Sequence, residues 1–210
     1  MRNKISILGS VHQYHYYKSS KQILKKVIKN YDPDIILAEL SPEQLKGTMT
    51  CNSKPEYPEI IIPLAKQENY KIIPIQPKTS KGFEWGARKD RILAKIHDEK
   101  SDKYNCYLKL NEILDEIIHE KEIMTLKDLQ SRKSDLMSCI SYNYLKALFP
   151  SWYEIKEEWN NYCLQNIIEQ EKKYNNSKIL ITIGFSHKFW LIQKLKKYKN
   201  IKLINIERYL

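Results

Sequence analysis

Two histidines stand in the same local pattern, and imidazole is a group that can bind a metal ion or transfer a proton. His12 closes the tetrapeptide GSVH, and His187 closes the tetrapeptide GFSH. Each tetrapeptide directly follows an apolar run, KISIL at 4–8 and KILITI at 178–183. A glycine lets the chain turn sharply after a strand and approach a ligand closely. One G-x-x-H tetrapeptide arises often by chance, but two of them, each after an apolar run, are a more specific signal.

The apolar runs alternate with segments of helical periodicity, which is the pattern of an α/β fold. Strands are predicted at 4–8, 34–38, 71–75, 178–183 and 201–206, and helices at 19–31, 58–69 and 188–199. The region from about 84 to 174 lacks strand patterns and predicts a helical insertion, with KTSKG at 78–82 as a hinge or loop before it. We therefore expect one domain over residues 1–210, with a mostly parallel central sheet, flanking helices, and the insertion over the carboxyl ends of the strands.

Polar residues follow the predicted strands where each one ends. Glu39 follows the second strand, Gln76 the third, and the two histidines the first and the fourth. Because the carboxyl ends of parallel strands meet at one edge of a sheet, we expect His12, Glu39 and His187 to converge there. A single histidine at a strand end is more often a hydrogen-bonded structural residue than a ligand. Two imidazoles and a carboxylate together suit a divalent ion such as Zn²⁺, Mn²⁺ or Co²⁺, which would activate a bound water.

Other polar residues are candidates for supporting roles in the same chemistry. Glu43 or His15 would act as a general base if it comes within hydrogen-bond reach of the water. Tyr14 or Asn160 would hold the substrate or an oxyanion. Replacing Glu39 with glutamine is expected to weaken metal binding and to leave the fold nearly intact.

Several segments of the chain carry a family resemblance. They are GSVH (9–12), PDIILAEL (33–40), IIPI (72–75), EEWNNYCLQNI (157–167) and ILITIGFSHKFWLIQKL (179–195). In type and order they resemble the TraB/PrgY/Tiki superfamily, which is linked to the ChaN and erythromycin-esterase-like proteins. The resemblance implies a metal site built from His12, Glu39 and His187, with Gly9 and Gly184 as turn residues. It also implies hydrolysis, because Tiki-type members are metal-dependent proteases, whereas other members are implicated in pheromone shutdown.

Two positions depart from the family pattern. Gln76 stands where members often have an acidic residue, and Trp159 precedes Asn160 where many members have Arg-Asn. Three functions therefore stay open. The first is a metal-dependent hydrolase of peptide, ester or other amide bonds. The second is a metal-free, erythromycin-esterase-like hydrolase, and the third is a binding protein that has lost catalysis.

Composition bounds the setting of these functions. The 210 residues carry a net charge of +11, which favours non-specific contact with anions, but the lysines are spread along the whole chain, as on a solvated surface. The four cysteines form no CxxC pair, which fits a reducing compartment. No segment approaches the roughly 20 apolar residues of a membrane helix. We expect a cytoplasmic protein without membrane contact, acting on a small-molecule or peptide substrate.

Overall fold

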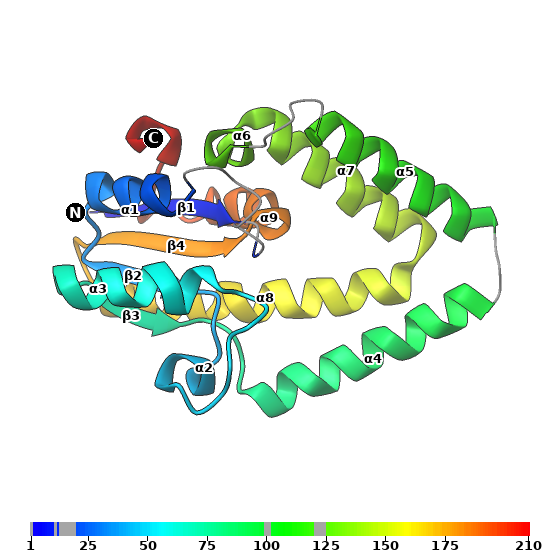
Figure 1. Ribbon diagram of the computed structural model, residues 1–210, viewed down its shortest axis with the longest axis horizontal. Helices are drawn as coiled ribbons and strands as arrows, with labels where there is room; N and C mark the ends of the chain where they lie inside the picture. The colour runs from blue at the N-terminus through cyan, green and yellow to red at the C-terminus, as the bar shows by residue number, and fades with distance from the viewer. Residues whose placement is uncertain (1, 11, 13–19, 99–101, 120–124) are drawn as a thin grey trace.

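The structure is a computed structural model that describes residues 2–10, 12, 20–98, 102–119 and 125–210. Within these residues, five strands form a single sheet in the order β3-β2-β4-β1-β5, and every neighbouring pair runs parallel. The strands are β1 (Asn3–Ser10), β2 (Ile35–Ala38), β3 (Lys71–Pro74), β4 (Lys178–Gly184) and β5 (Ile201–Ile204). The expected α/β architecture with a parallel central sheet is confirmed (Figure 1).

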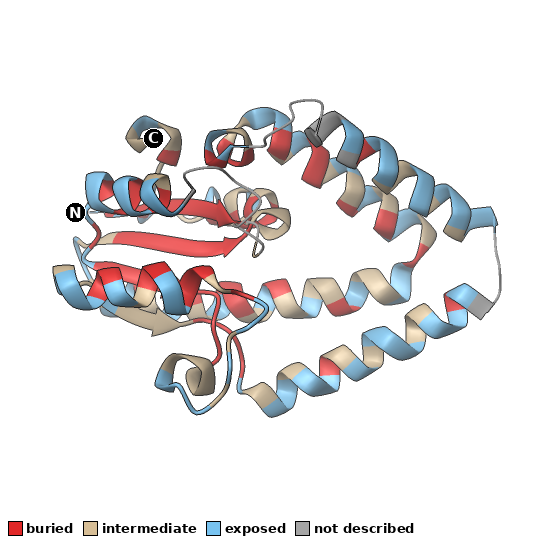
Figure 2. Cartoon of the chain, viewed as in Figure 1, coloured by how far each residue is buried: buried red, intermediate tan, exposed pale blue. Residues whose placement is uncertain are grey.

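Helices cover both faces of the sheet, because successive side chains of a strand point to opposite faces. Leu8 of β1 packs into one apolar core, and the preceding residue, Ile7, packs into the other. On the first face lie α1 (Ser20–Tyr31), the π-helical turn η2 (Tyr57–Ile61) and α3 (Ile62–Glu68), and on the second lie α8 (Pro150–Lys173) and α9 (Phe185–Leu195). With both faces covered, the central strands are buried along their length (Figure 2).

The strand order places β4 beside β1 at the centre of the sheet. The chain leaves β1 toward β2 on one side and leaves β4 toward β5 on the other. The helices that follow these two strands, α1 and α9, pack on opposite faces. This is a topological switch point, where an open α/β sheet forms a crevice beyond the carboxyl ends of its strands. A ligand site is therefore expected at the ends of β1 and β4.

A helical insertion extends beyond the carboxyl ends of the strands, as expected (Figure 1). Its helices are α4 (Thr79–Asp98), α5 (Asp102–His119), α6 (Leu126–Gln130), α7 (Arg132–Leu148) and α8. Its own small core contains Ile96, Leu145 and Phe149. Among the described helices, none is long and apolar enough to cross a membrane.

The strand boundaries differ from the prediction by one or two residues, and the helices differ more in three places. α4 begins at Thr79, so the KTSKG segment is largely the first turn of a helix rather than a hinge. The helix predicted at 58–69 is divided into η2 and α3, and Pro63 lies in the first turn of α3, where proline is tolerated. α9 begins at Phe185, directly after β4, so His187 lies in the first turn of that helix. The short helices α2 (Pro42–Lys46) and η3 (Ile206–Tyr209) add to the predicted elements.

Gln130 of α6 fixes the end of β1. The neighbouring strand β5 pairs only with the first half of β1, from Asn3 to Ser6. Beyond that point, the side-chain amide of Gln130 accepts the N–H of Gly9 at 2.9 Å and donates to the carbonyl of Gly9 at 2.7 Å. The amide stands in for the missing peptide group of a neighbouring strand, and it holds the backbone shortly before His12.

We predict that Tyr57→Phe destabilises the protein by about 0.5–1.5 kcal/mol. Tyr57 is fully buried, and its hydroxyl donates to the carbonyl of Thr182 at 2.9 Å and accepts the N–H of Glu39 at 3.0 Å. Phenylalanine keeps the ring but removes one partner from each backbone group, and the N–H of Glu39 still donates to the carbonyl of Thr182 at 3.0 Å. Urea unfolding measures the change, with Tyr70→Phe as the control, because the Tyr70 hydroxyl donates to the exposed Asp32 at 3.3 Å. Equal losses in the two variants would contradict the prediction.

Candidate functional site

The ends of β1, β2 and β4 bring His12, Glu39 and His187 together around Gly184. A β-carbon built on Gly184 would lie 3.3 Å from Nε2 of His12, 3.5 Å from Oε2 of Glu39 and 3.5 Å from Cδ2 of His187. The structure therefore has the convergence that the parallel strands predict. The lack of a side chain on Gly184 leaves open the space in which the three groups meet.

Gly9, the glycine of the G-x-x-H tetrapeptide that ends at His12, has a packing role. A β-carbon at Gly9 would lie 3.1 Å from the Cα of Phe185 and 3.2 Å from Cδ of Lys188. Glycine thus lets the start of α9 pack directly on the end of β1. This close packing places the first turn of α9, which contains His187, beside the end of β1, shortly before His12.

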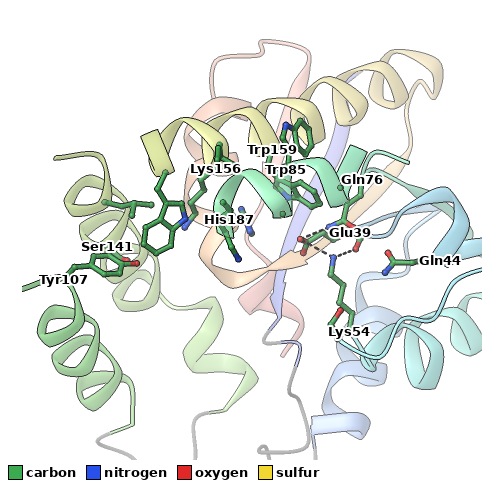
Figure 3. Close-up of a pocket in the computed structure, with 17 residues that line it drawn as sticks. Glu39, Gln44, Lys54, Gln76, Trp85, Tyr107, Ser141, Lys156, Trp159 and His187 are labelled. Carbon is green, nitrogen blue, oxygen red and sulfur yellow. Dashed lines mark hydrogen bonds and ion pairs between the residues drawn. The ribbon is translucent and has the colours of Figure 1, made fainter. Parts of the chain in front are cut away.

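Glu39 is a buried carboxylate that several groups hold in place (Figure 3). Its Oε2 accepts the N–H of Gly184 at 2.6 Å, and its Oε1 accepts the side-chain amide of Gln76 at 3.1 Å. The ammonium of Lys54 lies 3.4 Å from Oε1 and donates to the Glu39 carbonyl at 2.6 Å. Burial raises the pKa of Glu39, but Lys54, the two imidazoles and the Gly184 N–H together lower it to about 2. The carboxylate is therefore ionised at neutral pH.

His12 is oriented by a second buried carboxylate. Its Nδ1 lies 2.7 Å from Oε1 of Glu56, which also accepts the hydroxyl of Ser10 at 3.2 Å. A hydrogen bond from Nδ1–H to Glu56 leaves the lone pair of the neutral ring on Nε2. Nε2 faces Oε2 of Glu39 at 3.6 Å, which is too long for a hydrogen bond.

His187 is oriented by Asn160 of α8. Its Nδ1 lies 2.6 Å from Oδ1 of Asn160, whose amide donates to the hydroxyl of Tyr142 at 3.3 Å. Tyr142 in turn donates to Glu157, which fixes the position of this chain of hydrogen bonds. Burial lowers the pKa of His187 to about 4, against the opposing effect of Glu39. The imidazole is therefore neutral at pH 7, with its Nε2 lone pair available.

Glu39 and His187 lie in the wall of a cavity of about 540 Å³, whereas His12 is not among the residues that line it. The residues that line it are Glu39, Gln44, Ser53, Lys54, Gln76, Gly82, Trp85, Gly86, Lys89, Tyr107, Ser141, Leu145, Trp152, Ile155, Lys156, Trp159 and His187. Figure 3 shows the lining extending from Gln44 and Lys54 at one end to Tyr107 and Ser141 at the other, with His187 between them. Small-molecule sites typically have volumes of about 300–1,000 Å³. The strand ends supply Glu39 and Gln76, and the insertion supplies most of the remaining lining, including Lys89 and Lys156.

The other predicted site residues are placed differently. Asn160 is bonded to an imidazole and a tyrosine hydroxyl, so it positions a side chain rather than an oxyanion. Glu43 lies in α2, where its Oε2 accepts the N–H and the hydroxyl of Thr79 at 3.2 and 3.1 Å, and it does not line the cavity. Tyr14 and His15 lie outside the described residues. The role of Glu43 or His15 as a general base stays a prediction.

Lys54, Glu56 and Lys156 reach the site without having been predicted. Lys54 and Glu56 lie in the loop that connects α2 to η2, where no periodic pattern indicates a direction. The one signal is the local sequence KPEY, in which opposite charges flank a proline just before a helical segment. Lys156 lies in α8, whose side chains face both the cavity and the sheet, so helical periodicity alone does not assign it.

The chemistry of the donor set fits a divalent metal ion. Two imidazoles whose Nδ1 atoms are fixed, together with an ionised carboxylate, are ligands that Zn²⁺, Mn²⁺ and Co²⁺ accept. As the side chains stand, the part of the chain that the structure describes contains no group of three or more histidine, cysteine, aspartate or glutamate residues placed to hold one ion. A metal ion would also compete with the ammonium of Lys54 for the charge of Glu39.

Comparisons of the chain with known protein families, with curated proteins and with solved structures find no match. A function is therefore inferred from the geometry and the charges of the site.

We predict that the protein loses stability as the pH falls from 6.5 to 4, and that His187→Gln reduces this loss. The pKa of His187 is 6.5 in the unfolded chain and about 4 in the fold, so the unfolded state binds more protons in this range. The stability that neutral His187 contributes is present above pH 6.5 and is lost as the pH falls through 4. Each unit of lowered pKa corresponds to about 1.4 kcal/mol, so the expected effect is on the order of 3 kcal/mol.

The measurement is urea unfolding at each pH, with His97→Gln as the control, because His97 is exposed. The lowered pKa of Glu39 adds a further loss between pH 4.5 and about 2, which His97→Gln keeps in full and His187→Gln keeps in part, because His187 is one of the groups that lower this pKa. Identical pH profiles for the two variants would show that His187 is not held neutral by burial.

Proposed function

We propose that the chain is a metal-dependent hydrolase of peptide or ester bonds, with Mn²⁺, Co²⁺ or Zn²⁺ held by His12, Glu39 and His187. The observation that carries the proposal is the orientation of the two imidazoles. Each has its Nδ1 bound by an acceptor, Glu56 or Asn160, and each ring borders the space beside a buried carboxylate. Metal-binding histidines use the second nitrogen in this way to fix the tautomer and the ring orientation.

The spacing of the donors supports the same function. Nε2 of His12 and Oε2 of Glu39 face each other at 3.6 Å without a hydrogen bond. Two ligand atoms at about 2.1 Å from one tetrahedral ion lie about 3.4 Å apart. The low pKa of His187 also suits a ligand, which must be neutral, better than a general base, whose pKa works best near the operating pH.

Each side chain has a separate task in this proposal. A bound metal ion would polarise the scissile carbonyl and lower the pKa of a water. Glu39 provides the negative charge, while Gln76 and Lys54 keep its carboxylate in place. Glu56 and Asn160 keep the two rings aligned. The cavity formed by the insertion holds the substrate and excludes part of the solvent.

A metal-free hydrolase is the second candidate, and a specific contact favours it. The ammonium of Lys54 already balances the charge of Glu39, and a charged donor at this position would stabilise an oxyanion. In this candidate His187 would be the base, although its low pKa makes it a weak one. The dependence of activity on metal separates the two candidates.

Membership in the TraB/PrgY/Tiki superfamily is likewise a proposal. The residues that the resemblance selects as ligands, His12, Glu39 and His187, are the three that border Gly184. Gln76 stands where family members often have an acidic residue. Its amide donates to Glu39, which an ionised carboxylate could not do, so this difference does not remove a charge that the proposed site needs.

We predict that Mn²⁺, Co²⁺ or Zn²⁺ raises the melting temperature of the wild type relative to EDTA, and that Glu39→Gln largely loses this shift. A ligand at one hundred times its dissociation constant adds about 2.7 kcal/mol of stability, which is roughly 5–10 °C for a chain of this size. The comparison is made within each variant, because Glu39→Gln leaves Lys54 buried without its counter-charge and lowers the stability of the metal-free protein.

His97→Gln is the matched control, since His97 is an exposed histidine outside the cavity. A specific site predicts a full shift in this control. The same shift in all three proteins would mean that the metal binds at surface histidines, and no shift at millimolar metal would favour the metal-free hydrolase.

We predict that Gly184→Ala lowers hydrolysis of chromogenic ester and peptide substrates at least tenfold while the protein stays folded. The backbone of Gly184 has φ −53° and ψ 136°, which alanine adopts without strain. The added methyl group would occupy the space that His12, Glu39 and His187 share. Activity assays with circular dichroism as the folding control make the test, and a fully active Gly184→Ala variant would argue against a reaction at this point.

A further inference from the structure

Lys156 is a half-buried cation that projects from α8 into the cavity, close to His187 in Figure 3. Its ammonium lies 5.2 Å from the centre of the Tyr142 ring, and no carboxylate of the described residues forms an ion pair with it. Burial lowers the pKa of Lys156 to about 8, so the side chain is still mostly charged at pH 7. A partly desolvated ammonium without a counter-ion costs free energy, which a bound anion would offset.

The charges of the cavity wall also favour an anionic ligand. The lining contains three lysines and one glutamate, and that glutamate, Glu39, is already balanced by Lys54. Lys89 is exposed and solvated. Among the described residues, Lys156 is therefore the lysine of the lining that is both partly buried and without a carboxylate partner. One such ammonium matches a ligand with one negative charge.

The remaining wall near Lys156 is aromatic. Trp85 meets Trp159 edge to face at 5.4 Å between ring centres, and Tyr107 meets Trp152 in the same way at 5.3 Å. All four of these residues line the cavity. Aromatic walls favour an apolar, planar part of a ligand.

We propose that the substrate is a carboxylate-bearing amide or ester with an apolar acyl or aryl part, whose carboxylate pairs with Lys156 and whose apolar part packs on the tryptophans. This substrate class rests on the proposed hydrolase function. The scissile bond would then lie toward His12, Glu39 and His187, because His187 lines the same cavity as Lys156.

The test is a binding titration with N-benzoylglycine, which has an aryl ring, an amide and one carboxylate, against its neutral methyl ester. Three of the four tryptophans line the cavity, so intrinsic fluorescence reports binding. We expect the wild type to bind the acid at least tenfold more tightly than the ester. Lys156→Met should bring the two affinities within about twofold, and Lys156→Arg should keep most of the preference.

Lys172→Met is the matched control, because Lys172 is an exposed lysine on the same helix and does not line the cavity. It removes the same charge and should keep the preference for the acid. Equal affinity of the wild type for acid and ester overturns the proposal, and so does a folded Lys156→Met variant that still prefers the acid. The comparison of the two ligands on the wild type decides the matter even if Lys156→Met does not fold.

The two proposals fail in distinguishable ways. Hydrolysis of neutral esters by a wild type that shows no preference for the acid overturns the substrate class and supports the hydrolase. Tight binding of N-benzoylglycine without metal-dependent or metal-free turnover of any carboxylate-bearing amide or ester overturns the hydrolase, and it supports an anion-binding cavity.

Discussion

The ionised carboxylate of Glu39 is buried where the central strands end, and an unpaired charge in such a place would cost several kcal/mol. The surrounding structure stabilises that charge from several sides. The backbone of β4 donates through Gly184, the segment that follows β3 donates through Gln76, and a loop brings the ammonium of Lys54. The order of the strands, the backbone at Gly184 and the path of the loop thus all help to stabilise one charge.

α8 links the sheet to the cavity in one rigid element. Cys163 and Ile167, in its second half, are fully buried against the sheet, whereas Ile155, Lys156 and Trp159, in its first half, line the cavity. Asn160 lies between the two parts and holds His187. Because α8 packs on the sheet, it fixes both the orientation of the His187 ring and part of the cavity wall. A substitution in the sheet core that shifts α8 would therefore alter the cavity.

The sequence alone was enough to predict the parallel sheet and the meeting of His12, Glu39 and His187, because apolar runs and the polar residues after them carry that information directly. It was not enough for Lys54 and Glu56, whose positions depend on the path of a loop. Glu43 shows the limit most clearly, since it follows the second strand and was a candidate for the general base. A capping box between Ser41 and Gln44 starts α2 there, and the turn directs the Glu43 side chain to Thr79.

The contact of Gln130 with Gly9 has a consequence for the protein in concentrated solution. Among the described residues, no strand lies beside the second half of β1 on the β5 side, and free N–H and C=O groups on such an edge can pair with a strand of another molecule. Gln130 occupies both groups of Gly9 with a side chain, which offers no continuing backbone for further pairing. The insertion that shapes the cavity therefore also guards the sheet against intermolecular strand addition and the aggregation that follows from it.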